Sequence, residues 1–218
     1  MIDLYCERLG PGLWAEPLNA VTNLAFFIAA WATWHLAGHR ESGIFTSTWV
    51  LIALMVIIGM GSMLFHTFAQ TWARALDVVP ILLFQLVFLG LYCHRILGLG
   101  GAQTSLLCLV FLSITLAGRE FPHILNGTLP YVPALLALFV LGIVHYRNNR
   151  NEQAVLLGAF AVFLVSCLFR LIDNRICEYF PIGTHFLWHL LNAVLLYLVS
   201  RSYMISNANH GQIKKSNT

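Results

Sequence analysis

Long stretches without charge follow one another along the chain. Taking Asp, Glu, Lys and Arg as breaks leaves seven uncharged intervals, at residues 17–39, 42–73, 78–94, 96–118, 121–146, 153–169 and 179–200. A helix needs about 20 apolar residues, within a range of about 17–25, to cross the hydrocarbon of a bilayer. The pattern therefore predicts an all-α membrane protein that forms a bundle of seven transmembrane helices.

Turn residues and polar residues set the expected ends of these helices. We expect helices at Leu18–Leu36, Thr48–Phe68, from Asp77 onward with Pro80 near its first turn, Thr104–Leu116, Val132–Tyr146, Ala154–Leu171 and Thr184–Tyr203. Glycines at 98, 100 and 101 shorten the fourth apolar run below the usual spanning length, so we expect a tilted or partly interfacial helix there. The chain then divides into a polar lead at 1–16, a seven-helix domain at 17–205 and a disordered polar tail at 206–218.

Composition and charge agree with a membrane location and suggest an orientation. Of the 218 residues, 59% are hydrophobic and 10% are charged, whereas a soluble domain has about 25% charged residues. Seven spans place seven Lys and Arg residues on the C-terminal face and five on the N-terminal face. The positive-inside rule then predicts a cytoplasmic C-terminus. We expect no nucleic-acid partner.

Three histidines are positioned to share a metal ion. His185 and His189 are four residues apart, so on a helix they lie on one face and can bind one ion. His66 lies at the end of the second predicted helix, which runs toward the face of the membrane where the seventh begins. The topology thus gathers all three in the leaflet on the N-terminal side. Three imidazoles with a fourth position left for water are typical of catalytic zinc sites.

Two further polar residues belong to the same leaflet. Ser62 precedes His66 by four residues, and Asp77 is expected to begin the third helix. Ionisable groups within or beside spans are costly and usually serve a function inside the bundle. A carboxylate for proton transfer and a hydroxyl beside the reacting carbonyl would complete a hydrolytic zinc site.

The same residues bear on other functions that a helical membrane protein can have. Two histidines on one face of one helix cannot be opposite axial ligands of one haem. A retinal pigment needs a lysine within a span, and Lys214 and Lys215 lie in the tail. An intramembrane serine protease would use Ser62 and His66 but has no use for two further histidines. A non-enzymatic lipid sensor with structural zinc and a small-molecule carrier remain open; the sensor would need neither Ser62 nor Asp77.

The site residues form a spaced motif, and further segments accompany it. The motif is Ser62-x3-His66-x10-Asp77 with His185-x3-His189, and the segments are Tyr5-Cys6-Glu7, Ala15 to Asn23, and Asp173-x3-Cys177-Glu178. Together they resemble the alkaline ceramidases, within the superfamily of seven-helix zinc hydrolases that includes the adiponectin-type receptors. The resemblance implies hydrolysis of ceramide or a similar N-acyl lipid from the bilayer into a sphingoid base and a fatty acid.

The resemblance also implies roles for individual residues. Zinc would bind to His66, His185 and His189, with Asp77 as the general acid and base and Ser62 beside the reacting carbonyl. A calcium ion would bind near the N-terminus, with ligands at Glu7 and Glu16. The sequence departs from the family there, because Leu4 and Leu9 stand where oxygen ligands would be expected. Asp3 is a candidate substitute, since calcium takes six to eight oxygens.

Two cysteines lie in the segments that resemble the family. Cys6 and Cys177 are each followed by a glutamate, and both lie on the N-terminal face. The charge count puts that face on the non-cytoplasmic, oxidising side, where disulfides persist. We therefore expect a Cys6–Cys177 disulfide that ties the lead over the mouth of the site.

Overall fold

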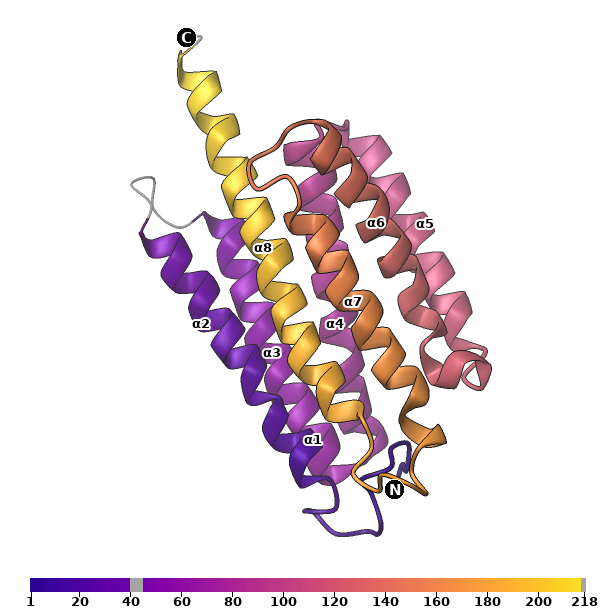
Figure 1. The fold of residues 1–218 in the computed structure, drawn as a ribbon. Coiled ribbons are helices and arrows are strands. Elements are labelled where there is room, and N and C mark those ends of the chain that lie inside the picture. The colour runs from indigo at the N-terminus through magenta and orange to yellow at the C-terminus, as the bar shows by residue number, and fades with distance from the viewer. Residues whose placement is uncertain (40–44, 217–218) are drawn as a thin grey trace.

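The protein is a bundle of long helices that run between two ends (Figure 1). The structure is a computed structural model and describes residues 1–39 and 45–216, with side chains through residue 207. Its helices are α1 (Pro17–Thr22), α2 (Leu24–Gly38), α3 (Thr46–Phe68), α4 (Thr71–Leu91), α5 (Gly101–Arg119), α6 (Val132–Arg147), α7 (Val155–Ile172) and α8 (His185–Ser216). A π-helical segment, Tyr92–Ile96, continues α4, and short 3-10 segments lie at Ile124–Gly127, Leu129–Tyr131 and Asp173–Arg175. The predicted all-α class is confirmed.

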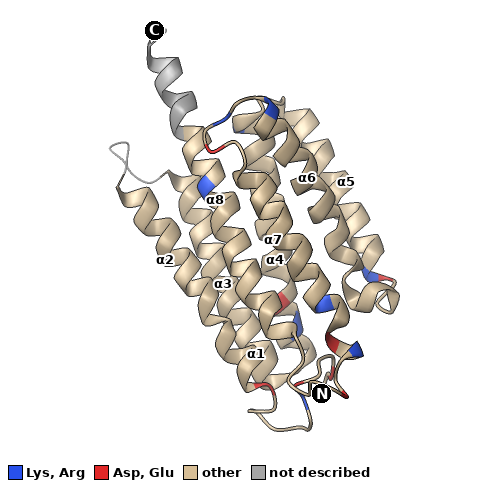
Figure 2. Ribbon diagram, viewed as in Figure 1, with Lys and Arg blue, Asp and Glu red and all other residues tan. Residues whose placement is uncertain are grey.

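Within the described residues, six helical stretches are long and apolar enough to cross a membrane. They are Pro17–Gly38, Thr46–Phe68, Thr71–Ile96, Gly101–Arg119, Leu129–Arg147 and Val155–Arg175. The last long helix, α8, is not among the six; its polar residues include His185, His189, Asn192 and Arg201, and it packs against α7 and α2. Figure 2 shows that the charged residues lie mostly toward the two ends of the bundle, as a membrane protein requires.

Several helix ends differ from the sequence prediction. The prediction of a short fourth helix was wrong, because α5 starts at Gly101 and runs for 19 residues. Gly98 has φ +74° and forms the preceding turn, and the Gln103 side chain accepts a hydrogen bond of 3.0 Å from the Gly100 N–H. The last helix also extends to Ser216, into the segment expected to be a disordered tail; residues 217–218 lie outside the described part.

The third long helix begins earlier than predicted, which changes the position of two residues. Because α4 starts at Thr71, Asp77 lies inside it and not at its start, and Pro80 lies in its interior. Proline has no N–H, so the carbonyl of Leu76 loses its usual partner four residues on. That carbonyl faces Gly61 of α3 so closely that a Cβ at Gly61 would collide with it. The two helices therefore meet at the level of Asp77.

The N-terminal lead crosses the end of the bundle beside the α7–α8 connection (Figure 1). Its Ile2 N–H donates to the Ala69 carbonyl at 2.7 Å. Cys6 forms a disulfide with Cys177, with Cα atoms 5.2 Å apart, which confirms the predicted pairing. The Cys6 N–H also donates to the Asp173 carboxylate at 3.2 Å. These contacts hold the lead over the end of α3 and the start of α8.

Candidate metal centre

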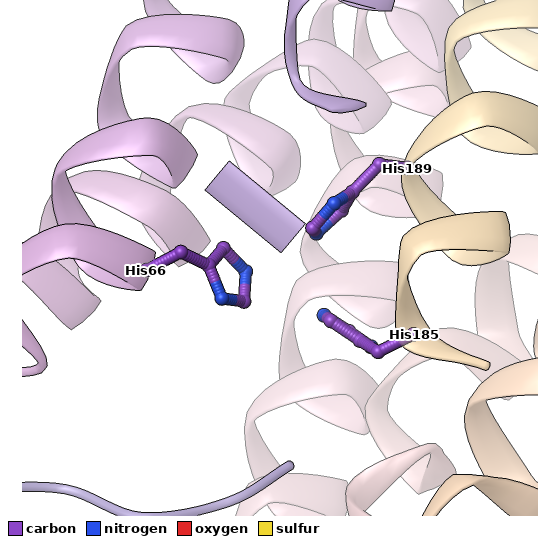
Figure 3. Close-up of side chains that lie close together, drawn as sticks. All are labelled: His66, His185 and His189. Carbon is purple, nitrogen blue, oxygen red and sulfur yellow. The ribbon is translucent and has the colours of Figure 1, made fainter. Parts of the chain in front are cut away.

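Three histidines from two helices meet at one end of the bundle. His66 lies in the last turn of α3, and His185 and His189 lie in the first two turns of α8. One ring nitrogen from each lies within 4.8 Å of those of the other two, and Figure 3 shows the rings directed toward one another. Their exposed fractions are 1%, 2% and 2%. Among the described residues, this is the one group of three or more such side chains that could hold a metal ion.

The hydrogen bonding of these histidines fits a metal with nitrogen ligands. Within the described part of the chain, His66 Nε2 and His185 Nδ1 are buried without a hydrogen-bond partner. His189 Nδ1 lies 3.0 Å from the Thr22 hydroxyl, which leaves its Nε2 available. Buried polar atoms without partners are costly and uncommon. Three converging imidazoles, two of them with such an atom, suit a tetrahedral ion such as zinc.

A buried carboxylate contacts the Nδ1 atom of His66. Glu16 accepts a contact of 2.5 Å from His66 Nδ1 and forms an ion pair with Arg8. Burial raises the pKa of Glu16, but the bonds to His66 and Arg8 outweigh burial and bring that pKa below its usual value. The Arg8 Nη2 also donates to the His66 carbonyl at 2.9 Å. This network fixes the ring orientation, as outer carboxylates commonly do for metal-bound histidines.

The start of α8 is held by Asp173. One carboxylate oxygen accepts the backbone N–H groups of Thr184 at 2.6 Å and His185 at 3.0 Å, which satisfies donors that a helix start leaves free. Tyr5 stacks on the His185 ring with centroids 3.6 Å apart, and burial raises the pKa of Tyr5 to about 12. The position of His185 is therefore set jointly by Asp173 and by Tyr5 of the N-terminal lead.

Ser62 and Asp77 lie on one cavity with two of the histidines. The cavity has a volume of about 330 Å³, and its walls include Ser62, Asp77, His185 and His189. Ser62 is buried and lines the same cavity as Asp77. Asp77 is half-buried and faces this cavity. The helix topology thus places a carboxylate and a hydroxyl beside the three imidazoles.

The residues expected to bind calcium have other partners. Glu7 accepts the backbone N–H groups of Leu18 at 2.6 Å and Asn19 at 2.8 Å, so it caps α1. Burial raises the pKa of Glu7. Glu16 is bonded to Arg8 and a histidine. Because both carboxylates already accept protein donors, they do not supply the open oxygen ligands that calcium takes.

Arg8 itself lies where a calcium ion would find oxygens. Its Nη1 is 3.4 Å from the Gly10 carbonyl and 3.5 Å from the Gly12 carbonyl, and its Nε donates to Glu16. Arg8 as a whole is 4% exposed. A fixed positive charge thus lies among the carbonyl and carboxylate oxygens of the lead, and these residues do not fit calcium. Sequence reasoning missed this role, although a basic residue between two glutamates was a signal.

Two further residues of the site were not identified from sequence. Thr22, in the first span, contacts His189, and Arg170, in the last turn of α7, lies on the cavity wall. A charged residue at the edge of a span was the available signal for Arg170. Nothing local distinguishes Thr22, since its partner is distant in sequence.

Fold and site together define a helical membrane protein with a buried three-histidine centre open to a cavity. The family model Ceramidase matches residues 10–217. The chain therefore belongs to the ceramidase family, whose members are hydrolases acting on amide bonds. No curated protein matches the chain significantly.

Proposed function

We propose that this protein is a zinc-dependent intramembrane amide hydrolase that cleaves ceramide or a similar N-acyl lipid into a sphingoid base and a fatty acid. The observation that carries the proposal is the cluster of His66, His185 and His189, two of which line one cavity with Asp77 and Ser62, in a chain of the ceramidase family. Bound zinc would supply a Lewis acid and lower the pKa of a water molecule to near 7.

The side chains around the ion have separable roles. The three imidazoles would hold zinc and leave a position open toward the cavity. The Asp77 carboxylate would accept a proton from the attacking water and pass it to the amine nitrogen as the C–N bond breaks. The Ser62 hydroxyl would donate a hydrogen bond to the carbonyl oxygen as negative charge develops there.

The bundle also offers space for apolar chains. A smaller apolar pocket of about 70 Å³ shares Ile81, Gln85 and Tyr131 with the cavity and extends between the helices. A groove of about 490 Å³ between α5 and α6 shares Gly118 with the cavity. Lipid chains would lie in these spaces with the amide at the metal centre, and the substrate would come from the bilayer.

The orientation in the membrane is part of the proposal. The excess of basic residues on the C-terminal face supports a cytoplasmic C-terminus, with α8 as the seventh span. The metal centre then lies toward the opposite face. The Cys6–Cys177 disulfide supports this orientation, because disulfides persist in oxidising compartments.

The purified full chain provides the test. Protein in detergent or nanodiscs would be incubated with an N-oleoyl ceramide, and the sphingoid base and oleate would be quantified by mass spectrometry. We expect equal amounts of the two products, loss of activity after chelation and recovery with zinc. A protein that binds ceramide and zinc but releases no product would contradict the proposal and favour a lipid sensor with structural zinc.

A further inference from the structure

Arg170 lies on the wall of the cavity, and no carboxylate lies within ion-pair distance of it in the described part of the chain. One of its donors is used, since Nη1 donates to the Tyr5 hydroxyl at 3.1 Å. Its Nε is buried without a hydrogen-bond partner among the described residues. A half-buried guanidinium without a carboxylate at ion-pair distance is costly, and such groups within a membrane protein usually serve a function.

Aromatic rings fix the position of this guanidinium. Its central carbon lies 5.7 Å from the ring centroid of Tyr5, 5.5 Å from that of Tyr131 and 5.2 Å from that of Trp188. Such contacts partly stabilise a cation and leave the edge of the guanidinium free to donate. The cage therefore presents the unused donors of Arg170 without neutralising its charge.

The same rings connect Arg170 to the metal centre. Tyr5 stacks on His185, and the Trp188 ring lies nearly parallel to that of His185 with centroids 6.5 Å apart. Arg170 thus lies one aromatic ring away from a predicted metal ligand. A group that it binds would be joined to the reacting amide by only a few bonds.

The cavity wall carries more positive than negative charge. Arg74, Arg119 and Arg170 all line the cavity, whereas Asp77 is its single acidic lining residue among those described. Figure 2 shows basic residues on α4, α5 and α7 toward the end of the bundle that holds the N-terminus. A wall with an excess of positive charge favours an anionic ligand, and ceramide carries no charge.

We propose that Arg170 binds a carboxylate on the amine part of the substrate, so that the protein cleaves N-acyl amino acids in preference to N-acyl lipids whose amine part is uncharged. This inference rests on the proposed amide hydrolysis and narrows its substrate class. Water adds to the acyl carbonyl, the C–N bond breaks, both protons of the water end on the amino acid nitrogen, which leaves as an ammonium group, and the acyl group leaves as a fatty acid carboxylate. Arg170 holds the amino acid carboxylate throughout.

A matched pair of amides tests this assignment. N-oleoylglycine and N-oleoylethanolamine share the acyl chain and the amide, but only the first carries a carboxylate. For the wild-type protein we expect kcat/KM to be about 10- to 100-fold higher for N-oleoylglycine, the worth of a charge-assisted hydrogen bond. Arg170→Gln should abolish this preference, and Arg170→Lys should retain part of it. Arg201→Gln, which changes an arginine in the middle of α8, should leave the preference unchanged.

Two outcomes would overturn the inference: a wild-type protein without the preference, or an Arg170→Gln variant that lowers kcat/KM for both amides equally. Zinc content and melting temperature show whether each variant is folded. If the wild type cleaves neither amide, the proposed hydrolysis is contradicted. The role of Arg170 as a carboxylate-binding residue is then tested by ligand binding alone. N-oleoylglycine should then still raise the melting temperature more than N-oleoylethanolamine does, and Arg170→Gln should remove the difference; an unchanged difference would overturn the assignment.

Discussion

The Nδ1 atom of His66 lies 2.5 Å from a carboxylate oxygen of Glu16, although 50 residues separate the two in sequence. Both side chains are almost completely buried, and Arg8 pairs with the other oxygen of the same carboxylate. Because Nδ1 is held by Glu16, the Nε2 atom of His66 is the one available to bind a metal ion. A residue expected to bind calcium thus orients a predicted zinc ligand.

Removing the carboxylate of Glu16 should weaken metal binding. For Glu16→Gln we expect a zinc affinity about 10- to 100-fold lower, the usual effect of losing an outer carboxylate. Competition with a zinc chelator measures this affinity, and melting in excess zinc shows whether the variant is folded. Glu120→Gln, at an exposed glutamate, is the control. Equal affinities for the Glu16 variant and the wild type would contradict the assigned role.

Each of the three histidines should be required for zinc. Replacing His66, His185 or His189 by Ala should remove most of the metal, because a catalytic zinc site keeps only three protein ligands. The exposed His94, whose Nδ1 bonds to the Leu99 carbonyl, provides the control, and His94→Ala should keep one zinc per chain. Elemental analysis of purified protein gives the answer. Full zinc in His189→Ala would remove that residue from the centre.

Mutation should distinguish the role of Asp77 from that of Ser62. Asp77→Asn should keep zinc but lower turnover by about 10²- to 10⁴-fold, the usual worth of a positioned acid and base. Ser62→Ala should lower turnover by about 10²- to 10³-fold and leave measurable activity. Product formation with N-oleoyl ceramide measures both. Covalent labelling of Ser62 by a serine-directed phosphonate would instead favour a serine hydrolase.

Gly61 should tolerate no side chain. A Cβ there would meet the Leu76 backbone carbonyl, which cannot move aside as a flexible side chain would. We expect Gly61→Ala to destabilise the protein by about 1–3 kcal/mol, as overpacking does, and to lower activity by separating α3 from α4. Gly158→Ala, where a Cβ meets open space, should be neutral or stabilising by up to about 1 kcal/mol. Thermal melting of both variants compares them, and equal stability would refute the close approach.

The fold should not depend on calcium. Since Arg8 already contacts the oxygens of the lead, the melting temperature should be the same in calcium and in a calcium-selective chelator. Arg8→Gln should destabilise the protein by roughly 3–5 kcal/mol, because it leaves the buried Glu16 carboxylate without its ion pair. Arg201→Gln, which breaks an exposed pair with Glu152, should cost at most about 1 kcal/mol. A melting temperature that rises with calcium in the wild type would contradict this.

Several features could be predicted from the sequence because their causes are local. Apolar runs long enough to span a bilayer indicated the helices, and six of the seven expected spans meet that criterion. The four-residue spacing of His185 and His189 places them on one helix face. The direction of each span then brings His66 to the same end. Cys6 and Cys177 lie in segments that resemble the family, and the structure joins them.

Other features depend on which distant groups meet, and the sequence alone does not specify this. The sequence by itself determined an all-α membrane protein with three histidines able to share an ion. Only the tertiary structure decided that α4 begins at Thr71, that Glu16 faces His66 and Arg8, and that three rings surround Arg170. Hydrophobic length is set by neighbouring residues along the chain. The partner of a buried charge is set by packing between segments far apart in sequence, because each such charge must find compensation wherever the fold places it.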